Sequence, residues 1–544
     1  AVIDKSQLAL DEIKLLQSVN KQILQILHKE HIPGMAVALV NESGIIWANA
    51  FGVANTKNNN PVSLQTLFSL QSQTKIFTTL GVLSAVQNQQ LDLKTPIINY
   101  IPNLKLYSVY ESSPANKITL IHLLSHTAGF AHDAPIGNNN NSRADFATHI
   151  QSILNGTWLQ FKVGSDYNYS NVGMDLAGYI LQTQSHQYYC EYMKQYVLIP
   201  LEMNSSTFNL EQFLNSNHAE GYIDGIDTAP YNYSLIPSGG MYSNVLDMAH
   251  YLQLVLNNGM YKGNQVLNKE LFNTMLTIPF PLQGQTEGNA LGNWKGQRLS
   301  TTYYSHLGRG FGFSNNLEWY PEYGLGIVVL SNKYTTNNVD VAVSHLILDA
   351  IIKKRQYQKR SQLQQYMVGE YISNMGSIQI LKDKQSNKLA LNGTVNSGPT
   401  GNTAVIVKSP IIFVEDNIFY LASDKKIHNE LPMLYRYIAP QDHNGIATIE
   451  RLADGYHWYF NQSAYMKDGP NKPSWQKFTG MYKLEGYGAP FYIKVAIKHG
   501  YLYIGSLKLI EHKPGIFAAA NGQMLVFNPG HVSWMNLNLL RVKE

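Results

Sequence analysis

Apolar positions follow two different periods near the start of the chain. Over residues 8–30 they recur every third or fourth position, as on one face of a helix, until Pro33 and Gly34 interrupt the pattern. Residues 35–54 instead form two runs rich in strand-forming side chains, separated by the turn-forming residues 41–44. The pattern therefore predicts a helix followed by a β-hairpin.

Later segments alternate between helical and strand-like patterns. From about 76 to 300 helices and long loops dominate, and strands return at 311–321 and 324–332 before a helix at 339–355. Early and late strands can complete one antiparallel sheet, with the terminal helices packed on it and a helical lobe between them in sequence. We therefore predict an α/β domain with its active site at the seam between sheet and lobe, a common place for pockets.

The pattern changes again after about residue 357. Short alternating strands with Gly and Asn turns replace the helices, and the stretch from Gly369 resembles the stretch from Gly480. Such strands predict an all-β, barrel-like antiparallel domain. We therefore divide the chain into a domain at 1–356 and a β domain at 357–544, with the linker near 357–367.

Composition limits the classes of partner. Hydrophobic residues make up 44% of the 544 residues and charged residues 14%, which favours a large folded core over disorder. The net charge is only +4, and the one basic cluster, at 351–360, is interpreted as a solvated helix end, so we expect no nucleic-acid partner. No run of 18 apolar residues occurs, so no membrane-spanning helix is expected.

The sequence does not indicate a metal site, a cofactor site or a disulfide. The single cysteine, Cys190, excludes an intrachain disulfide. The histidines are scattered without a His-Glu-x-x-His pattern, and no cofactor or metal is expected. No Gly-x-Ser-x-Gly occurs, which argues against the nucleophile of an α/β-hydrolase. The many Asn, Gln and Tyr residues favour a periplasmic or secreted bacterial protein.

The pattern Ser-x-x-Lys carries the first candidate chemistry. On a helix, residues three apart share a face, so the lysine can approach the serine hydroxyl and, if its pKa is lowered, accept the proton. The pattern is weak alone, because it occurs at Ser18–Lys21, Ser72–Lys75 and Ser474–Lys477. Only Ser72 has further motifs in a suitable order. We therefore interpret Ser18–Lys21 as the solvated face of a helix, and Ser474–Lys477 as a structural pair at the start of a predicted strand.

Two further motifs accompany Ser72. A Tyr-x-Asn pattern facing the serine is offered both by Tyr169 with Asn171 and by Tyr242 with Asn244, each before a helix, and the residues alone do not choose between them. Asn171 also suits a helix N-cap. A short strand carrying a cation and then glycine is offered by His306-Leu307-Gly308, where the glycine would let the backbone approach the substrate. The same spacing at His443–Gly445 lies in the tail and is interpreted as a turn.

In this order the motifs resemble the serine β-lactamase and penicillin-binding protein superfamily. The similarity extends from about 20 to 335 and is closest to the class C β-lactamase-like branch, which includes esterases and D-amino-acid-specific peptidases. Residues 91–104, 118–130 and 236–252 also resemble segments of that branch. The last of these makes Tyr242 part of a Gly-Gly loop, so the resemblance selects Tyr169 and Asn171.

The resemblance implies a role for each residue. Ser72 would be the acylated nucleophile, Lys75 would help to deprotonate it, and Tyr169 would be a second acid–base group that helps to activate the deacylating water. Asn171 would position the substrate amide or Lys75. The backbone N–H groups of Ser72 and Arg309 would bind the oxyanion. His306 and Gly308 would form the substrate-binding edge. The tail resembles lipocalin-like barrels that follow the catalytic domain in some of these peptidases.

One departure from the family pattern shapes the expected function. Many β-lactamases and transpeptidases carry Lys-Thr-Gly where this chain has His306-Leu307-Gly308. Histidine is largely uncharged at neutral pH, so a permanent cation for a β-lactam carboxylate is missing. The expected function is hydrolysis of small peptides, particularly those with D-amino acids, or of amides or esters. A β-lactamase or penicillin-binding DD-peptidase, and a silent binding protein for cell-wall fragments, remain as alternatives.

Overall fold

The computed structural model describes most of the first 351 residues and the strands of the remainder. The described ranges are 2–4, 10–137, 144–224, 236–281, 285–299, 301–351, 367–373, 376–382, 389–396, 403–413, 418–421, 434–438, 447–452, 456–460, 470–484, 491–498, 500–505, 507–519, 523–534 and 537–542. The predicted domain boundary at 356/357 and most of the predicted linker fall outside them.

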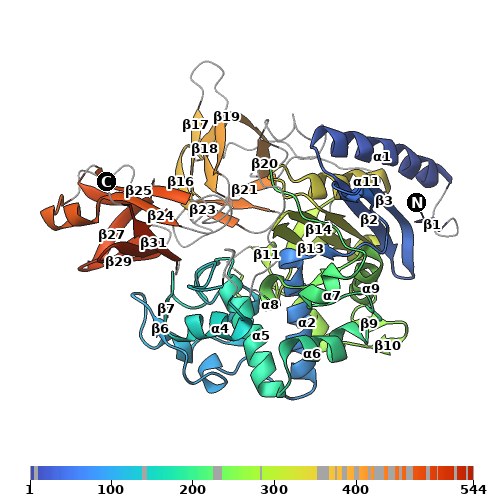
Figure 1. Cartoon of the computed structure of the whole chain (residues 1–544), viewed down its shortest axis with the longest axis horizontal. Coiled ribbons are helices and arrows are strands. Elements are labelled where there is room, and N and C mark those ends of the chain that lie inside the picture. Colours follow the sequence, from blue (N-terminus) through green and yellow to red (C-terminus); the bar gives the residue numbers. More distant parts are fainter. Residues whose placement is uncertain are drawn as a thin grey trace.

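A nine-stranded antiparallel sheet forms the centre of the first part (Figure 1). Its main path runs β1 (Val2–Ile3), β3 (Gly44–Asn55), β2 (Gly34–Asn41), β15 (Leu325–Ser331), β14 (Phe313–Tyr320), β13 (Thr301–Gly310), β12 (Trp294–Arg298) and β11 (Gly288–Asn289), while β4 (Asn60–Pro61) pairs with β3. The predicted hairpin is confirmed, because Asn41 pairs with Gly44 across the turn. Strands from both ends of this region therefore meet, as the pattern predicts.

Both faces of the sheet are covered. On β2, Met35 and Val37 face a core shared with α1 (Leu10–Lys29) and α11 (Val339–Ile351), whereas Ala36 and Ala38 face the helical lobe. This alternation follows from the two-residue period of a strand. The lobe helices are α2 (Thr74–Gln87), α3 (Leu120–Leu124), α4 (Phe146–Leu154), α5 (Asn171–Ser185), α6 (Tyr189–Met193), α7 (Leu210–Leu214), α8 (Ile236–Gly239), α9 (Val245–Leu256) and α10 (Lys269–Met275).

The lobe is built around α2. Residues Thr74–Ala85 of this helix are all buried, which is typical of a helix that other elements surround on every side. Two short strand pairs, β5 (Phe68–Ser69) with β8 (Tyr242–Ser243) and β6 (Leu106–Tyr107) with β7 (Thr157–Trp158), and the hairpin of β9 (Met260–Tyr261) and β10 (Asn264–Gln265) tie the loops. The β5–β8 pair fixes the chain directly before α2.

The tail contains two closed barrels where the sequence predicts one barrel-like domain. The first comprises β16 (Gly369–Ser373), β17 (Gly376–Lys382), β18 (Leu389–Asn396), β19 (Thr403–Phe413), β20 (Ile418–Leu421), β21 (Leu434–Ile438), β22 (Thr448–Arg451) and β23 (Tyr456–Phe460). The second comprises β24 (Gly480–Leu484), β25 (Phe491–Lys498), β26 (Tyr501–Ile504), β27 (Leu507–Lys513), β28 (Ile516–Ala519), β29 (Met524–Asn528), β30 (His531–Trp534) and β31 (Leu537–Arg541). The repeat seen in the sequence therefore marks the first strand of each barrel, at Gly369 and Gly480.

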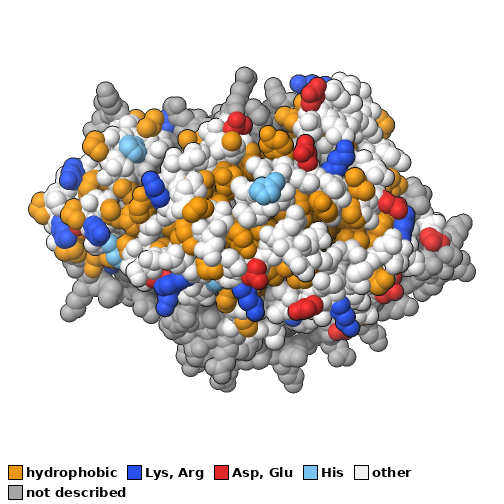
Figure 2. All heavy atoms as spheres, turned by 90° about the horizontal axis from the view of Figure 1, so that it is seen from below, with side chains coloured by type: hydrophobic (Ala, Val, Ile, Leu, Met, Phe, Trp, Pro, Cys, Tyr) orange, Lys and Arg blue, Asp and Glu red, His pale blue; other side chains and the backbone are white. Residues whose placement is uncertain are grey.

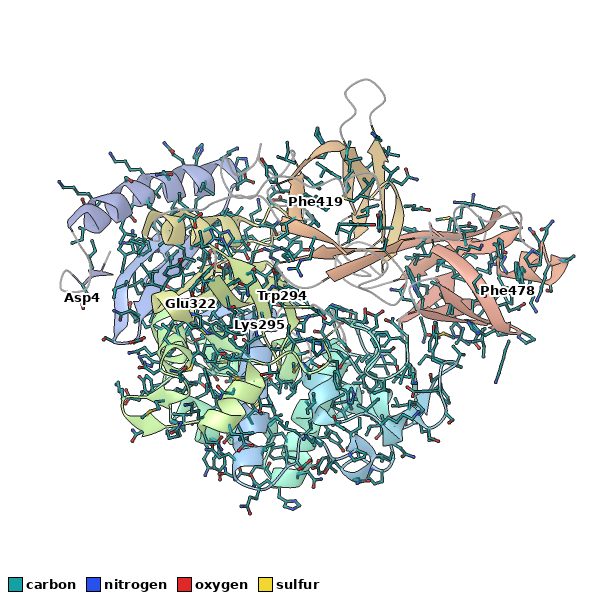
Figure 3. All side chains as sticks on the ribbon, turned by 180° about the vertical axis from the view of Figure 1, so that it is seen from behind. Asp4, Trp294, Lys295, Glu322, Phe419 and Phe478 are labelled. Carbon is teal, nitrogen blue, oxygen red and sulfur yellow. The ribbon has the colours of Figure 1, made fainter. Side chains whose placement is uncertain are left out.

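Each barrel contacts the first part of the chain. Ile418 and Leu452 of the first barrel join the core that includes Trp294, and Arg436 of β21 forms an ion pair with Glu287. Figure 3 marks Phe419 in the first barrel, Phe478 beside the second and Trp294 in the sheet. In the second barrel the apolar core extends to Ala131 of the lobe. The barrels are thus packed against the lobe and the sheet.

The described surface carries dispersed charges. On the face in Figure 2, basic and acidic side chains are scattered among polar and apolar ones rather than gathered in one basic patch. Among the helices that the structure describes, none is both long and apolar enough to cross a bilayer.

Candidate active site

Ser72 lies in a strained turn between a strand and a helix. It is the middle residue of a 3-10 turn, Gln71–Gln73, which follows β5 and runs directly into α2. Gln71 has φ +52°, a left-handed conformation that costs a residue with a side chain about 1–2 kcal/mol. Its Nε2 donates to Ser69 Oγ at 2.7 Å. Ser72 is partly exposed while its neighbours are buried, so the turn presents this hydroxyl to the solvent.

Lys75 contacts the serine from within the lobe. Its Nζ lies 3.1 Å from Ser72 Oγ and donates to the carbonyl oxygen of Ser238 at 2.7 Å. Burial lowers the pKa of Lys75 to about 7, against the opposing charges of Asp175 and Asp133. A substantial fraction of this amine is therefore neutral at neutral pH and can accept the serine proton.

Tyr169 covers the lysine from the loop directly before α5. Its ring centroid is 4.8 Å from Lys75 Nζ, and the ring packs against His126, His132 and His306 with centroids 4.5, 5.7 and 6.3 Å away. The side chain is half-buried. The structure therefore brings the phenol, the lysine and the serine of the first two motifs together.

Asn171 is near the same site but has an unexpected partner. Its Nδ2 donates to Asp133 Oδ1 at 3.0 Å. The expectation that it caps α5 is wrong, because the cap is Ser170, whose Oγ accepts from the Gly173 N–H at 3.1 Å. The cap falls on Ser170 because its backbone is still extended, whereas Asn171 already belongs to the helix.

The third motif lies on a strand edge beside the serine. β12 pairs with β13 only as far as Ser305, so His306 and Gly308 continue past the end of β12. A Cβ on Gly308 would lie 2.1 Å from the carbonyl oxygen of Leu70, so only glycine allows the Ser72 turn to approach this strand. The backbone that approaches this glycine is thus that of the Ser72 turn, and the approach of substrate to it stays a prediction.

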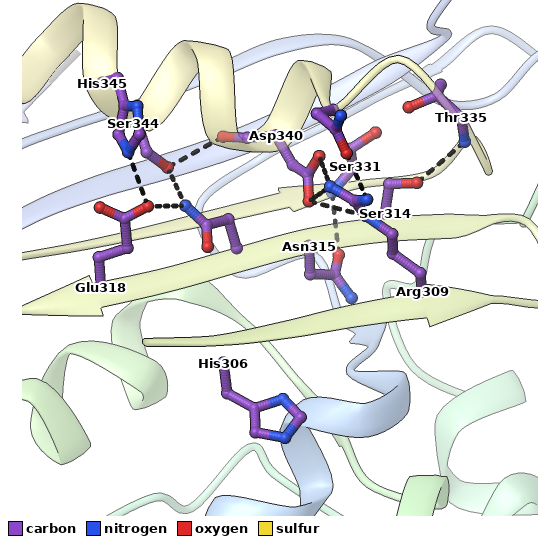
Figure 4. A network of polar contacts seen from close by, with 12 residues as sticks. His306, Arg309, Ser314, Asn315, Glu318, Ser331, Thr335, Asp340, Ser344 and His345 are labelled. Atoms are coloured by element: carbon purple, nitrogen blue, oxygen red, sulfur yellow. Dashed lines mark hydrogen bonds and ion pairs between the residues drawn. The ribbon is translucent and has the colours of Figure 1, made fainter. Parts of the chain in front are cut away.

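His306 and Arg309 lie on opposite faces of the sheet (Figure 4). His306 Nδ1 is 2.6 Å from the Leu307 carbonyl oxygen, which can only accept, so Nδ1 carries a proton and Nε2 is the basic nitrogen of the neutral ring. The Arg309 guanidinium donates to both oxygens of the fully buried Asp340, at 2.8 and 3.0 Å. Its side chain is therefore committed to α11, and the oxyanion role of its backbone N–H stays a prediction.

The first part of the chain matches a known family: residues 19–351 match the Beta-lactamase family. This chain belongs to the beta-lactamase family. It is 26% identical over 357 residues to Protein flp of Staphylococcus aureus (strain NCTC 8325 / PS 47), over 64% of this chain and 69% of that one. It is 28% identical over 382 residues to a beta-lactamase of Yersinia enterocolitica, over 64% and 94%. The resemblance inferred from the motifs is confirmed.

Solved structures of the same fold extend over most of the chain. An octameric penicillin-binding protein homologue from Pyrococcus abyssi aligns with a TM-score of 0.56 and 21% identity, over 82% of this chain and 99% of that chain. The crystal structure of SurE with D-Leu aligns with a TM-score of 0.55 and 18% identity, over 82% and 100%. These similarities confirm the fold class of an α/β domain followed by a β-barrel region.

The competing motifs are structural in this beta-lactamase family member. Tyr242 is buried and stacks on Phe213 with centroids 4.1 Å apart, and Asn244 caps α9. The Ser18 and Ser474 pairs lie on exposed positions. The His443 pattern lies outside the described residues. The choice of Tyr169 over Tyr242 therefore agrees with the geometry around Lys75.

Sequence reasoning missed a carboxylate and its histidine. Asp133 is buried, and its Oδ2 lies 2.8 Å from Nδ1 of the partly exposed His132. Burial would raise the pKa of Asp133, but the charge and hydrogen bond of His132 lower it below its ordinary value, with help from Asn171 and Lys75. No motif marks this pair, and only the fold brings it beside Tyr169.

His126 holds the loop that carries Tyr169. Its Nδ1 accepts from the Ser170 N–H at 3.1 Å, and its carbonyl oxygen accepts from the Asn168 N–H at 3.0 Å. Burial, together with nearby Lys75 and two histidines, places the pKa of His126 well below the ordinary value, so the ring is neutral.

In the described part of the chain, no group of three or more His, Cys, Asp or Glu side chains is arranged to hold a metal ion.

Proposed function

We propose that this chain is a serine hydrolase that forms an acyl-enzyme on Ser72. The observation that carries the proposal is the fully buried Lys75 amine, 3.1 Å from Ser72 Oγ, with its pKa lowered to about 7. A lysine with an ordinary pKa would be protonated and could not act as a base in neutral solution.

The proposed reaction proceeds in two balanced steps. Neutral Lys75 takes the Ser72 proton as Oγ bonds to the substrate carbonyl carbon, and this proton passes to the leaving group as the bond to that group breaks. Water then attacks the acyl carbon, and the bond between that carbon and Ser72 Oγ breaks. Tyr169 helps to remove the water proton, and one proton returns to Ser72 Oγ. The N–H groups of Ser72 and Arg309 would bind the oxyanion in both steps.

The proposed substrates are small peptides with D-amino acids, or small amides and esters. The histidine at position 306 supports this choice, because it supplies no permanent cation to hold a β-lactam carboxylate. One structure of the same fold was solved with D-Leu. A β-lactamase or penicillin-binding activity is the second candidate, because a curated beta-lactamase is among the relatives.

The test is covalent labelling followed by intact mass. The chain is incubated with a fluorophosphonate probe and with fluorescent penicillin, beside Ser72→Ala and Ser474→Ala. Ser474 belongs to an exposed Ser-x-x-Lys pair and is thus a matched control. Fluorophosphonate labelling that is lost only in Ser72→Ala would support the proposal, and the penicillin result would separate its two candidates.

If neither probe forms an adduct, the proposal is contradicted. The third alternative, a silent binding protein for cell-wall fragments, would then take its place. The intact set of Ser72, Lys75, Tyr169 and Asn171 favours the enzyme, because a binding protein needs no depressed lysine beside a serine hydroxyl.

A further inference from the structure

A buried histidine–aspartate pair lies behind Lys75. His149 of α4 and Asp175 of α5 have no exposed side-chain surface, and His149 Nε2 is 2.8 Å from Asp175 Oδ2. Neither residue belongs to a motif of the predicted site. A fully buried aspartate needs such a partner, because an unpaired buried carboxylate is strongly unfavourable.

The pair holds Ser238, the residue whose carbonyl oxygen accepts a hydrogen bond from Lys75. Asp175 Oδ1 accepts from the Ser238 N–H at 2.9 Å, and the Ser238 carbonyl oxygen accepts from Lys75 Nζ at 2.7 Å. Gly178, one turn after Asp175, allows this approach, since a Cβ there would lie 2.4 Å from the Pro237 side chain. The backbone of Ser238 therefore connects the His149–Asp175 pair on one side to the amine beside Ser72 on the other.

The geometry places one proton between His149 and Asp175. His149 Nδ1 is 2.7 Å from the Ile136 carbonyl oxygen, which only accepts, so Nδ1 donates. The contact of Nε2 with a carboxylate then requires a further proton, on the ring or on the acid. Burial would lower the pKa of His149, but the hydrogen bond and charge of Asp175 raise it. The pair is therefore neutral as a unit.

We propose that His149 and Asp175 form a positioning pair that fixes the Ser238 carbonyl against Lys75. In this pair His149 supplies the positive charge that Asp175 would otherwise take from Lys75. The inference rests on the proposed acylation of Ser72. His149 and Asp175 act through Ser238 and Lys75 and are positioning residues. The titratable groups around Lys75 in the described chain are Asp133, His132, His126, His149, Tyr169, Asp175, Tyr189 and His306.

Two substitutions should move the reactivity of Ser72 in opposite directions. Asp175→Asn keeps an acceptor for Ser238 but removes a negative charge, so Lys75 should lose its proton more easily. His149→Gln leaves Asp175 without its cation, so Lys75 should become the counter-ion and keep its proton to higher pH. On the acid side of the pH profile, the rate of fluorophosphonate labelling should fall as Lys75 becomes protonated, and we call this fall the acid limb. We expect the acid limb to lie about 1 pH unit lower in Asp175→Asn and about 1 pH unit higher in His149→Gln.

The assay measures the second-order labelling constant between pH 5 and 9. A control is His122→Gln, which removes a partly buried histidine at the third position of α3, where glutamine also suits the capping box. Its limb should stay at the wild-type position. An unshifted limb in either test variant, or shifts in the same direction, would overturn the inference.

A measurement on the wild-type protein covers the case in which a variant does not fold. Neutron diffraction at pH 8 should show a deuteron between His149 Nε2 and Asp175 Oδ2, and its absence would overturn the inference. Failure of the wild type to label at Ser72 would instead contradict the proposed function, so the two failures are distinguishable.

Discussion

Gly308→Ala tests how closely the Ser72 turn lies against the sheet. The added Cβ would lie 2.1 Å from the Leu70 carbonyl oxygen, whereas carbon and oxygen normally approach to about 3.3 Å. The turn or the strand must therefore move by about 1 Å. Overpacking of this kind typically costs about 1–3 kcal/mol, and an error of about 1 Å in catalytic geometry lowers the rate about 100-fold. We expect labelling by a fluorophosphonate to slow about 100-fold.

The assay compares labelling rate and thermal unfolding. The control is Gly173→Ala, also near the site, where the nearest atom to the new Cβ is 3.4 Å away and alanine favours the helix. This variant should label at nearly the wild-type rate. Wild-type labelling and an unchanged melting temperature in Gly308→Ala would refute the close approach of Leu70 to β13.

Three further substitutions test individual roles. Tyr169→Phe keeps the ring over the lysine but removes the hydroxyl, so intact mass should show an acyl-enzyme that accumulates with ester substrates; equal turnover would contradict the deacylation role. His306→Ala should change the pH–rate profile, and an unchanged profile would contradict a role for its charge. Arg309→Met leaves Asp340 as an unpaired buried charge, so the free energy of unfolding should fall by about 3–5 kcal/mol in a denaturant titration, whereas Lys262→Met, from an exposed pair, should change little. Equal effects of these two methionine substitutions would contradict the buried ion pair.

Local patterns were sufficient for the main elements of the sheet. The helical spacing over 8–30 became α1, and the strands at 311–321 and 324–332 became β14 and β15, because the first has a helical period and the other two are short runs bounded by Gly and Pro turn signals. The division of the tail into two barrels was not predicted. Strand periodicity is local, whereas barrel closure depends on pairing between strands far apart, such as β16 with β23.

The candidate site divides in the same way. The order of motifs along the sequence was enough to select Ser72 and Lys75, and the family resemblance that this order carries selected Tyr169 over Tyr242. It did not identify Asp133, His149 or Asp175. These side chains become important through contacts between α4, α5 and the loop before α4, and no spacing in the sequence reports such contacts.

The amino-acid order thus determined the family, the main strands and the candidate nucleophile with its base, since each is recognised from short segments of the sequence. The tertiary structure determined the pKa of Lys75 and thus its ability to act as a base. Burial within the lobe lowers this pKa to about 7, although two nearby carboxylates, themselves paired with histidines, act to raise it. Burial and charge are properties of the packed molecule, and therefore they appear only when the chain has folded.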